Sequence, residues 1–122
     1  MTETLPQVSK QGDATIITLR RIHDGFDDGL LAELTKLILD VIDTANPPNV
    51  VIDMSQTTVF TSSFIGVLTH CYQQMKTREG GRFVISGLTS FAKDIFSVTK
   101  LHRVFDIYPT REDAFRALSH TF

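Results

Sequence analysis

Short strand-like runs alternate with helical segments along this chain, and that alternation limits its fold more than any other feature. Residues 50–54 (VVIDM) and 82–87 (RFVISG) are short apolar runs of the kind found in strands that are covered on both faces. Between these two runs, apolar residues recur at the three- and four-residue spacing of a helix. Because parallel strands need a crossover that is usually helical, the pattern predicts a largely parallel sheet with right-handed connections.

Two long amphipathic helices are expected in the first two thirds of the chain. The first follows Asp27 and ends before residues 46–49 (NPPN), because proline disfavours helix at its own position and at the preceding one. The second begins near residues 61–63 and ends at Gly80 and Gly81, which we expect to form a left-handed cap. Their apolar stripes are Leu30, Leu31, Leu34, Leu37, Ile38, Val41 and Ile42 in the first, and Phe64, Val67, Leu68, Cys71, Tyr72 and Met75 in the second.

The two ends of the chain complete the pattern. Residues 7–21 contain two short strands that meet at a turn formed by Gly12 and Asp13, which indicates an antiparallel hairpin. Toward the C-terminus we expect a short helix that contains Phe91, Ile95, Phe96 and Val98, a strand over residues 104–108 and a final helix over residues 112–118. The predicted fold is therefore α/β, with a mixed, mainly parallel β-sheet, an N-terminal antiparallel hairpin and about four helices.

Composition narrows the class of protein. A chain of 122 residues is expected to form one domain over residues 1–122. A net charge of -2 offers no excess of positive charge for nucleic acid, so we expect no nucleic-acid partner. The chain shows no signal-like N-terminus and no stretch apolar enough to insert directly into a membrane, and its one cysteine, Cys71, cannot form an internal disulfide. These features predict a cytoplasmic protein.

A cluster of hydroxyl side chains stands where the strand at residues 50–54 leads into the second helix. Thr61, Ser62 and Ser63 fall in the first turn, where a side-chain oxygen can accept a hydrogen bond from an unpaired backbone N–H group. Capping explains one such residue. A helix N-terminus also carries a partial positive charge, so a phosphate on one of these hydroxyls would be tolerated locally and would change the charge of the surface. The local sequence leaves both interpretations open.

The wider pattern resembles the STAS domain family, whose type members are bacterial anti-sigma factor antagonists. The residues that carry the resemblance are VVIDMS at 50–55, FTSSFIGVL at 60–68, GGRFVISG at 80–87, and residues 101–108 with Ala114. The resemblance covers about residues 5–118 and implies a STAS-type fold. In the family the strand-to-helix loop typically reads Asp-Ser-Ser/Ala-Gly-Leu-Gly. The serine after the aspartate is phosphorylated by a partner that is both a serine kinase and the anti-sigma factor, and the unphosphorylated antagonist binds that partner.

The resemblance implies a phosphoacceptor and a partner. Ser62 matches the phosphorylated serine, with Thr61, which stands at the family's aspartate, as the alternative acceptor. The implied partner is a serine kinase of the histidine-kinase-like ATPase class that also acts as an anti-sigma factor. The partner-binding residues carried over are Thr61, Ser63, Phe64, Ile65 and Gly66.

Two further questions stay open at the level of sequence. Phe64 stands at the family's first glycine, and its side chain belongs either to the docking surface or to the core. The chain is either a phosphorylation-dependent antagonist that regulates transcription or stress signalling, or a constitutive STAS scaffold or accessory subunit of a signalling or transport complex.

Other chemistry is poorly supported. Asp53 ends a strand, as does the phosphate-accepting aspartate of receiver domains, but the chain lacks the acidic pair and the lysine that a Mg²⁺-dependent phosphoaspartate site needs. We therefore expect Asp53 to bond the loop backbone. The four histidines have no partner at zinc-ligand spacing, and no nucleophile elbow or phosphate-binding glycine loop is present. The sequence predicts a binding protein with no catalytic residues, metal or cofactor.

Overall fold

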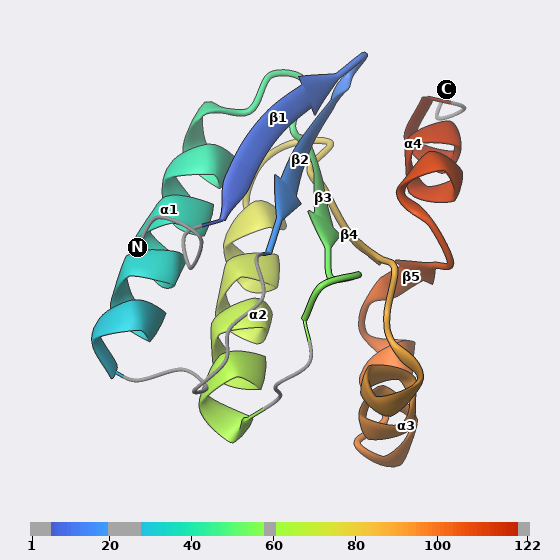
Figure 1. Ribbon diagram of the computed structural model, residues 1–122. Helices are drawn as coiled ribbons and strands as arrows, with labels where there is room; N and C mark the ends of the chain where they lie inside the picture. The colour runs from blue at the N-terminus through green and yellow to red at the C-terminus, as the bar shows by residue number, and fades with distance from the viewer. Residues whose placement is uncertain (1–5, 20–27, 58–60, 120–122) are drawn as a thin grey trace.

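The computed structural model describes residues 6–19, 28–57 and 61–119, which form a five-stranded sheet with helices on both faces (Figure 1). The strands lie in the order β1-β2-β3-β4-β5, so each strand neighbours the next one in the chain. β1 (Gln7–Gln11) and β2 (Ala14–Thr18) are antiparallel, whereas β3 (Asn49–Asp53), β4 (Arg82–Ser86) and β5 (Asp106–Tyr108) run parallel to β2. The predicted mixed sheet with an N-terminal hairpin is confirmed.

Turn residues set the hairpin and the end of the first helix. Gly12 has a φ of 57°, in the left-handed region that a two-residue hairpin turn requires, and Gln11 pairs directly with Ala14. α1 (Asp28–Thr44) ends before Asn46 and Pro47, as the sequence predicts.

The helices cover the two faces of the sheet unequally. α1 and α2 (Ser62–Met75) lie side by side on one face, and α4 (Arg111–Ser119) lies on the other (Figure 1). α3 (Ser90–Val98) adds Ala92 and Phe96 to the face of α1 and α2, and we call this larger cluster the first core. The second core, beneath α4, consists of Ala14, Ile16, Val51, Val84, Ala114 and Leu118.

Alternation along each strand assigns its side chains to these two cores. In β3, Val51 faces the second core and the next residue, Ile52, faces the first, and both are fully buried. The central strands are therefore apolar on both faces, which explains why their sequences read as continuous apolar runs.

Two predicted boundaries are wrong. α2 ends at Met75 with a right-handed C-cap at Lys76, so Gly80 and Gly81 do not cap it. They belong instead to the turn that leads into β4, where Gly80 has a φ of 74° and a Cβ on Gly81 would lie 2.4 Å from the carbonyl oxygen of Met75.

The last strand is shorter than predicted. β5 begins at Asp106, because the preceding residues form a 3₁₀ turn, η2 (Leu101–Arg103), and the backbone N–H of Phe105 donates to the carbonyl of Leu101.

Candidate functional site

The hydroxyl cluster lies at the start of α2. Thr61 is the N-cap, with an extended backbone (φ -120°, ψ 161°), and its Oγ1 accepts a hydrogen bond from the backbone N–H of Phe64 at 3.1 Å. The first intrahelical bond, from the N–H of Ile65 to the carbonyl of Thr61, is 3.0 Å long. Thr61 therefore fills the capping role that the sequence assigned to one of the three hydroxyl residues.

Ser62 and Ser63 occupy the first two helical positions, and both are exposed. Within the described residues, no hydrogen bond involves either side-chain hydroxyl. The first turn of α2 contains no acidic residue, so no carboxylate there offsets the positive end of the helix dipole. A free hydroxyl at this place can accept a phosphate without any loss of the cap.

The next three residues differ in exposure. Phe64 is fully buried and belongs to the first core, Ile65 is half-buried, and Gly66 is exposed with nothing within 4 Å of the position its Cβ would occupy. Of the two alternatives for Phe64, the structure supports a core position, so its side chain supports the surface from beneath. We call the surface formed by Thr61, Ser62, Ser63, Ile65 and Gly66 the α2 entry surface.

A buried ion pair stands at the same edge of the sheet. Asp53, 5% exposed at the end of β3, accepts two hydrogen bonds on Oδ2 from Arg111, from Nε at 3.0 Å and from Nη2 at 2.5 Å. Nη2 of Arg111 also donates to Oγ1 of Thr18 at the end of β2, and Oδ1 of Asp53 accepts from the backbone N–H of Ser55. The pair thus joins β2, β3 and the start of α4 just before the chain enters the loop that precedes Ser62.

The prediction that Asp53 bonds the loop backbone is confirmed by the Ser55 contact. A receiver-type phosphoaspartate gains no support, because Arg111 occupies the carboxylate and no cluster of three possible metal ligands exists among residues 6–19, 28–57 and 61–119. Sequence reasoning missed Arg111. The sequence offered one indication of its role, a cation at the start of the last helix. In a parallel sheet of this topology, that position lies near the edge where the carboxyl ends of the strands meet.

The remaining candidate residues have structural surroundings. Cys71 is fully buried in α2, and burial raises the pKa of its thiol to about 12. Arg78 donates from Nη1 to the carbonyls of Ile42 and Ala45 and so ties the end of α2 to the end of α1. His70 and His102 are exposed, and His23 and His120 lie outside the described residues.

The family model described as STAS domain matches residues 6–114. Among the part of the chain that the structure describes, no helix combines the length and the hydropathy needed to cross a bilayer.

Several solved structures share the fold. An anti-sigma-factor antagonist (STAS) domain protein from Planctomyces limnophilus matches with a TM-score of 0.83 and 22% identity, over 93% of this chain and 97% of that one. An anti-sigma factor antagonist from Mycobacterium paratuberculosis matches with a TM-score of 0.76 and 23% identity, over 92% and 91%. The Bacillus cell fate determinant SpoIIAA in its phosphorylated form matches with a TM-score of 0.67 and 13% identity, over 93% and 98%.

Proposed function

The chain belongs to the STAS domain family, and on that premise we propose that it is an anti-sigma factor antagonist whose binding to a serine kinase is controlled by phosphorylation of Ser62. The partner in this proposal is a kinase of the histidine-kinase-like ATPase class that also acts as an anti-sigma factor. The protein would act in the cytoplasm as a binding module, regulating transcription or stress signalling without a catalytic step of its own.

The exposed hydroxyl of Ser62 carries this proposal. Ser62 stands at the first position of α2, while the neighbouring Thr61 supplies the cap through its Oγ1. The cap therefore does not depend on Ser62, and the exposed side chain of Ser62 supports its role as the acceptor in this proposal.

The start of α2 also suits the physical requirements of a switch. A phosphate would add a charge of about -1.5 to -2 at a position where free N–H groups and the helix dipole stabilise an anion. The domain would stay folded, because the buried residues beneath, such as Phe64, are unaffected. The α2 entry surface would change from neutral to strongly anionic, and a partner fitted to the neutral form would be released.

The first experiment incubates the protein with ATP and the serine kinase encoded beside it, and maps phosphorylated residues by mass spectrometry. We expect one phosphate on Ser62 and none on the Ser62→Ala variant, whereas Ser63→Ala is phosphorylated normally. Thr61→Asp separates the alternative acceptor from the cap, because aspartate caps a helix as well as threonine does but has no hydroxyl. Phosphorylation that persists in Ser62→Ala and disappears in Thr61→Asp would assign the acceptor to Thr61.

Partner affinity tests the switch itself. We expect Ser62→Ala to bind the kinase like the unmodified protein and Ser62→Asp to bind it much more weakly. Equal affinity of the two variants would contradict a phosphorylation switch at this position.

A second candidate, a constitutive STAS scaffold or accessory subunit, is favoured by one observation. At the family's aspartate this chain has Thr61, whose side-chain oxygen is bonded to the N–H of Phe64, so no carboxylate stands beside Ser62 at that position. A scaffold would co-purify with its partner regardless of ATP and would carry no phosphate on Thr61, Ser62 or Ser63. A kinase that binds the protein tightly but never modifies it would favour this candidate.

A further inference from the structure

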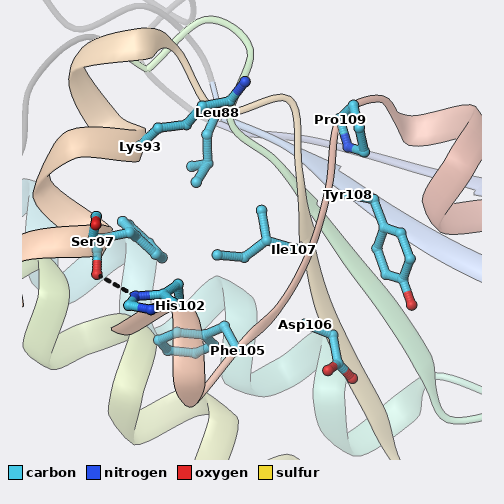
Figure 2. A pocket seen from close by; sticks show the side chains of 10 residues that line it. Leu88, Lys93, Ser97, His102, Phe105, Asp106, Ile107, Tyr108 and Pro109 are labelled. Atoms are coloured by element: carbon cyan, nitrogen blue, oxygen red, sulfur yellow. Dashed lines mark hydrogen bonds between the residues drawn. The ribbon is translucent and has the colours of Figure 1, made fainter. Parts of the chain in front are cut away.

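A cavity of about 600 Å³ lies between α3, η2 and β5, apart from the α2 entry surface (Figure 2). Its volume is within the range of small-molecule sites, about 300–1,000 Å³. Nothing in the proposed switch at Ser62 uses this cavity. We propose that it binds a small amphiphilic monocarboxylate, a molecule with an apolar body and one carboxylate group.

Five of the ten residues that line the cavity are apolar. Leu88, Phe96 and Phe105 are 8%, 1% and 2% exposed and belong to the first core, and Ile107 is half-buried against the same core. Figure 2 shows the side chain of Ile107 pointing into the cavity from β5. An alkyl or aromatic body placed there would cover the apolar surface that is still open to water, mainly that of Ile107 and Pro109, which is favourable at roughly 25 cal/mol per Å².

Asp106 and Tyr108 also line the cavity, but strand alternation turns their side chains away from it. Asp106 and Tyr108 flank Ile107 in β5, so their side chains point to the opposite face of the sheet, where Tyr108 packs against the second core. Figure 2 shows both side chains directed away from Lys93 and Ile107. Asp94 lines a separate hollow on α3 with Phe91 and Val98. None of these groups opposes an anion inside the cavity.

Among the polar groups at the cavity, the ammonium of Lys93 is the one that only donates hydrogen bonds. Lys93 extends across one end of the cavity, above Leu88 (Figure 2), and its ammonium makes no hydrogen bond or ion pair with any of the described residues. His102 lies farther along the cavity, with Nδ1 3.3 Å from the carbonyl oxygen of Phe96, so Nδ1 donates to that carbonyl and the Nε2 atom of the neutral ring is an acceptor that does not bind a carboxylate. The hydroxyl of Ser97 lies on the same wall.

This distribution of charge selects the class of ligand. A free cation at one end, a partly apolar lining and an Asp106 carboxylate that is turned away from the cavity match a molecule with a single anionic head and an apolar body. Charge-assisted hydrogen bonds from an ammonium to a carboxylate are among the stronger polar contacts that a protein offers.

Decanoate, kept below its critical micelle concentration, is the probe, and binding is followed by two-dimensional NMR of the full-length ¹⁵N-labelled protein. We expect shifts to concentrate at Leu88, at Phe96 and around Ile107. Lys93→Gln should weaken binding by about twofold to fivefold, the range for an exposed ion pair. Because Lys93 is exposed, this variant should fold normally. Lys100→Gln, an exposed lysine that does not line the cavity, is the matched control and should bind decanoate like the unmodified protein.

Decanol, which has the same chain length but no charge, should bind more weakly than decanoate and should be insensitive to Lys93→Gln. Three outcomes would overturn the proposal: equal affinity of decanoate for the unmodified protein and Lys93→Gln, shifts centred on the exposed Phe91 and Val98 instead of the cavity, or no response to decanoate while the serine kinase perturbs the same residues. The last outcome would assign the cavity to a protein partner.

Discussion

Arg111 joins segments that lie far apart in the sequence. Its guanidinium contacts the carboxylate of Asp53 and the hydroxyl of Thr18, so one side chain at the start of α4 holds the carboxyl ends of β2 and β3 together. The side chain of Asp53 is 7% exposed and that of Arg111 34%, so the carboxylate is shielded from water far more than its partner. Removal of the cation would leave a buried charge unpaired, which costs much more than the loss of an ion pair on the surface.

We predict that Arg111→Met lowers the free energy of unfolding by about 2 kcal/mol, below the value for a fully buried pair because Arg111 is partly exposed. Urea denaturation measures the change. Arg116→Met is the control, because its contact with Asp113 is 3.6 Å long and exposed, and it should cost about 0.5 kcal/mol or less. Asp53→Asn combined with Arg111→Met should cost less than the two single changes added together. Equal costs for Arg111→Met and Arg116→Met would contradict a stabilising role for the buried pair.

Cys71 offers a measurement of burial that depends on pH. Burial raises the pKa of its thiol to about 12, from a usual value near 9.0, so the folded protein holds the thiol proton in a range where the unfolded chain releases it. Because the unfolded state then binds fewer protons, stability falls as pH rises from about 9 toward 12. Below about pH 8 the thiol is protonated in both states and contributes almost no pH dependence.

We predict that an aromatic disulfide reagent at pH 8 modifies Cys71 in the native protein only as fast as the protein opens, and modifies it rapidly in urea. In the alkaline range, the stability of the unmodified protein should decline more steeply with pH than that of Cys71→Ala. Rapid native labelling at pH 8 would mean that α2 does not bury this side chain as the structure has it.

At the scale of elements, α2 and α3 begin in the same way but differ in what surrounds the cap. Thr61 and Thr89 each accept a hydrogen bond from the N–H three residues later, at 3.1 and 3.2 Å. After Thr61 come two exposed serines and, one turn beyond Ser62, the exposed Gly66. Residues four apart share a helix face, so Ser62 and Gly66 present a flat strip without bulky side chains.

Gly66 lowers the stability of α2 at this strip, because glycine is a poor helix former. We predict that Gly66→Ala stabilises the protein by about 0.5–1 kcal/mol, because alanine is the better helix former and the added methyl group meets nothing within 4 Å. The same variant should bind the serine kinase more weakly, since the methyl group stands where a partner would approach the α2 entry surface. Gln74→Ala, near the other end of α2, should change stability by about 0.5 kcal/mol or less and leave binding unchanged. A gain in stability with full binding would move the partner away from this strip.

The sequence predicted elements better than their ends, and local contacts better than distant ones. Apolar periodicity located the four α-helices and the central strands, because each buries one stripe or both faces. The exposed strand β1 was predicted from its turn residues, and the 3₁₀ turn η2 was not predicted. The prediction that Gly80 caps α2 was wrong, because a glycine with a left-handed backbone fits a turn before a strand as well as a helix cap. The contact of Arg111 with Asp53 spans 58 residues and has no local signature, so only the assembled sheet reveals it. The side-chain positions of Phe64 and Ile65 likewise depended on the packing of α2.

At the scale of the whole molecule, the two cores are joined by shared strands. Adjacent residues of β3, Val51 and Ile52, belong to the second and first core respectively, and the same alternation occurs in β4 with Val84 and Ile85. α4 covers the second core within the described residues, yet its first residue, Arg111, reaches the edge of the sheet that leads to the α2 entry surface. Stability should therefore be shared between the faces, and loss of packing under α4 should reach α1 and α2 on the far side.

Leu118→Ala tests this coupling. Leu118 is 4% exposed in the second core, so we predict a loss of about 2–3 kcal/mol from the removed apolar contacts and the cavity left behind. If the domain unfolds as one cooperative unit, hydrogen exchange measured by mass spectrometry should show the same loss of protection in the slowest-exchanging peptides of α1 as in those of α4. Arg116→Ala, exposed on the same helix, should leave both unchanged within about 0.5 kcal/mol. Loss of protection in α4 alone, with α1 unchanged, would mean that α4 opens separately from the rest of the domain. The contact between Arg111 and Asp53 would then break and re-form under native conditions.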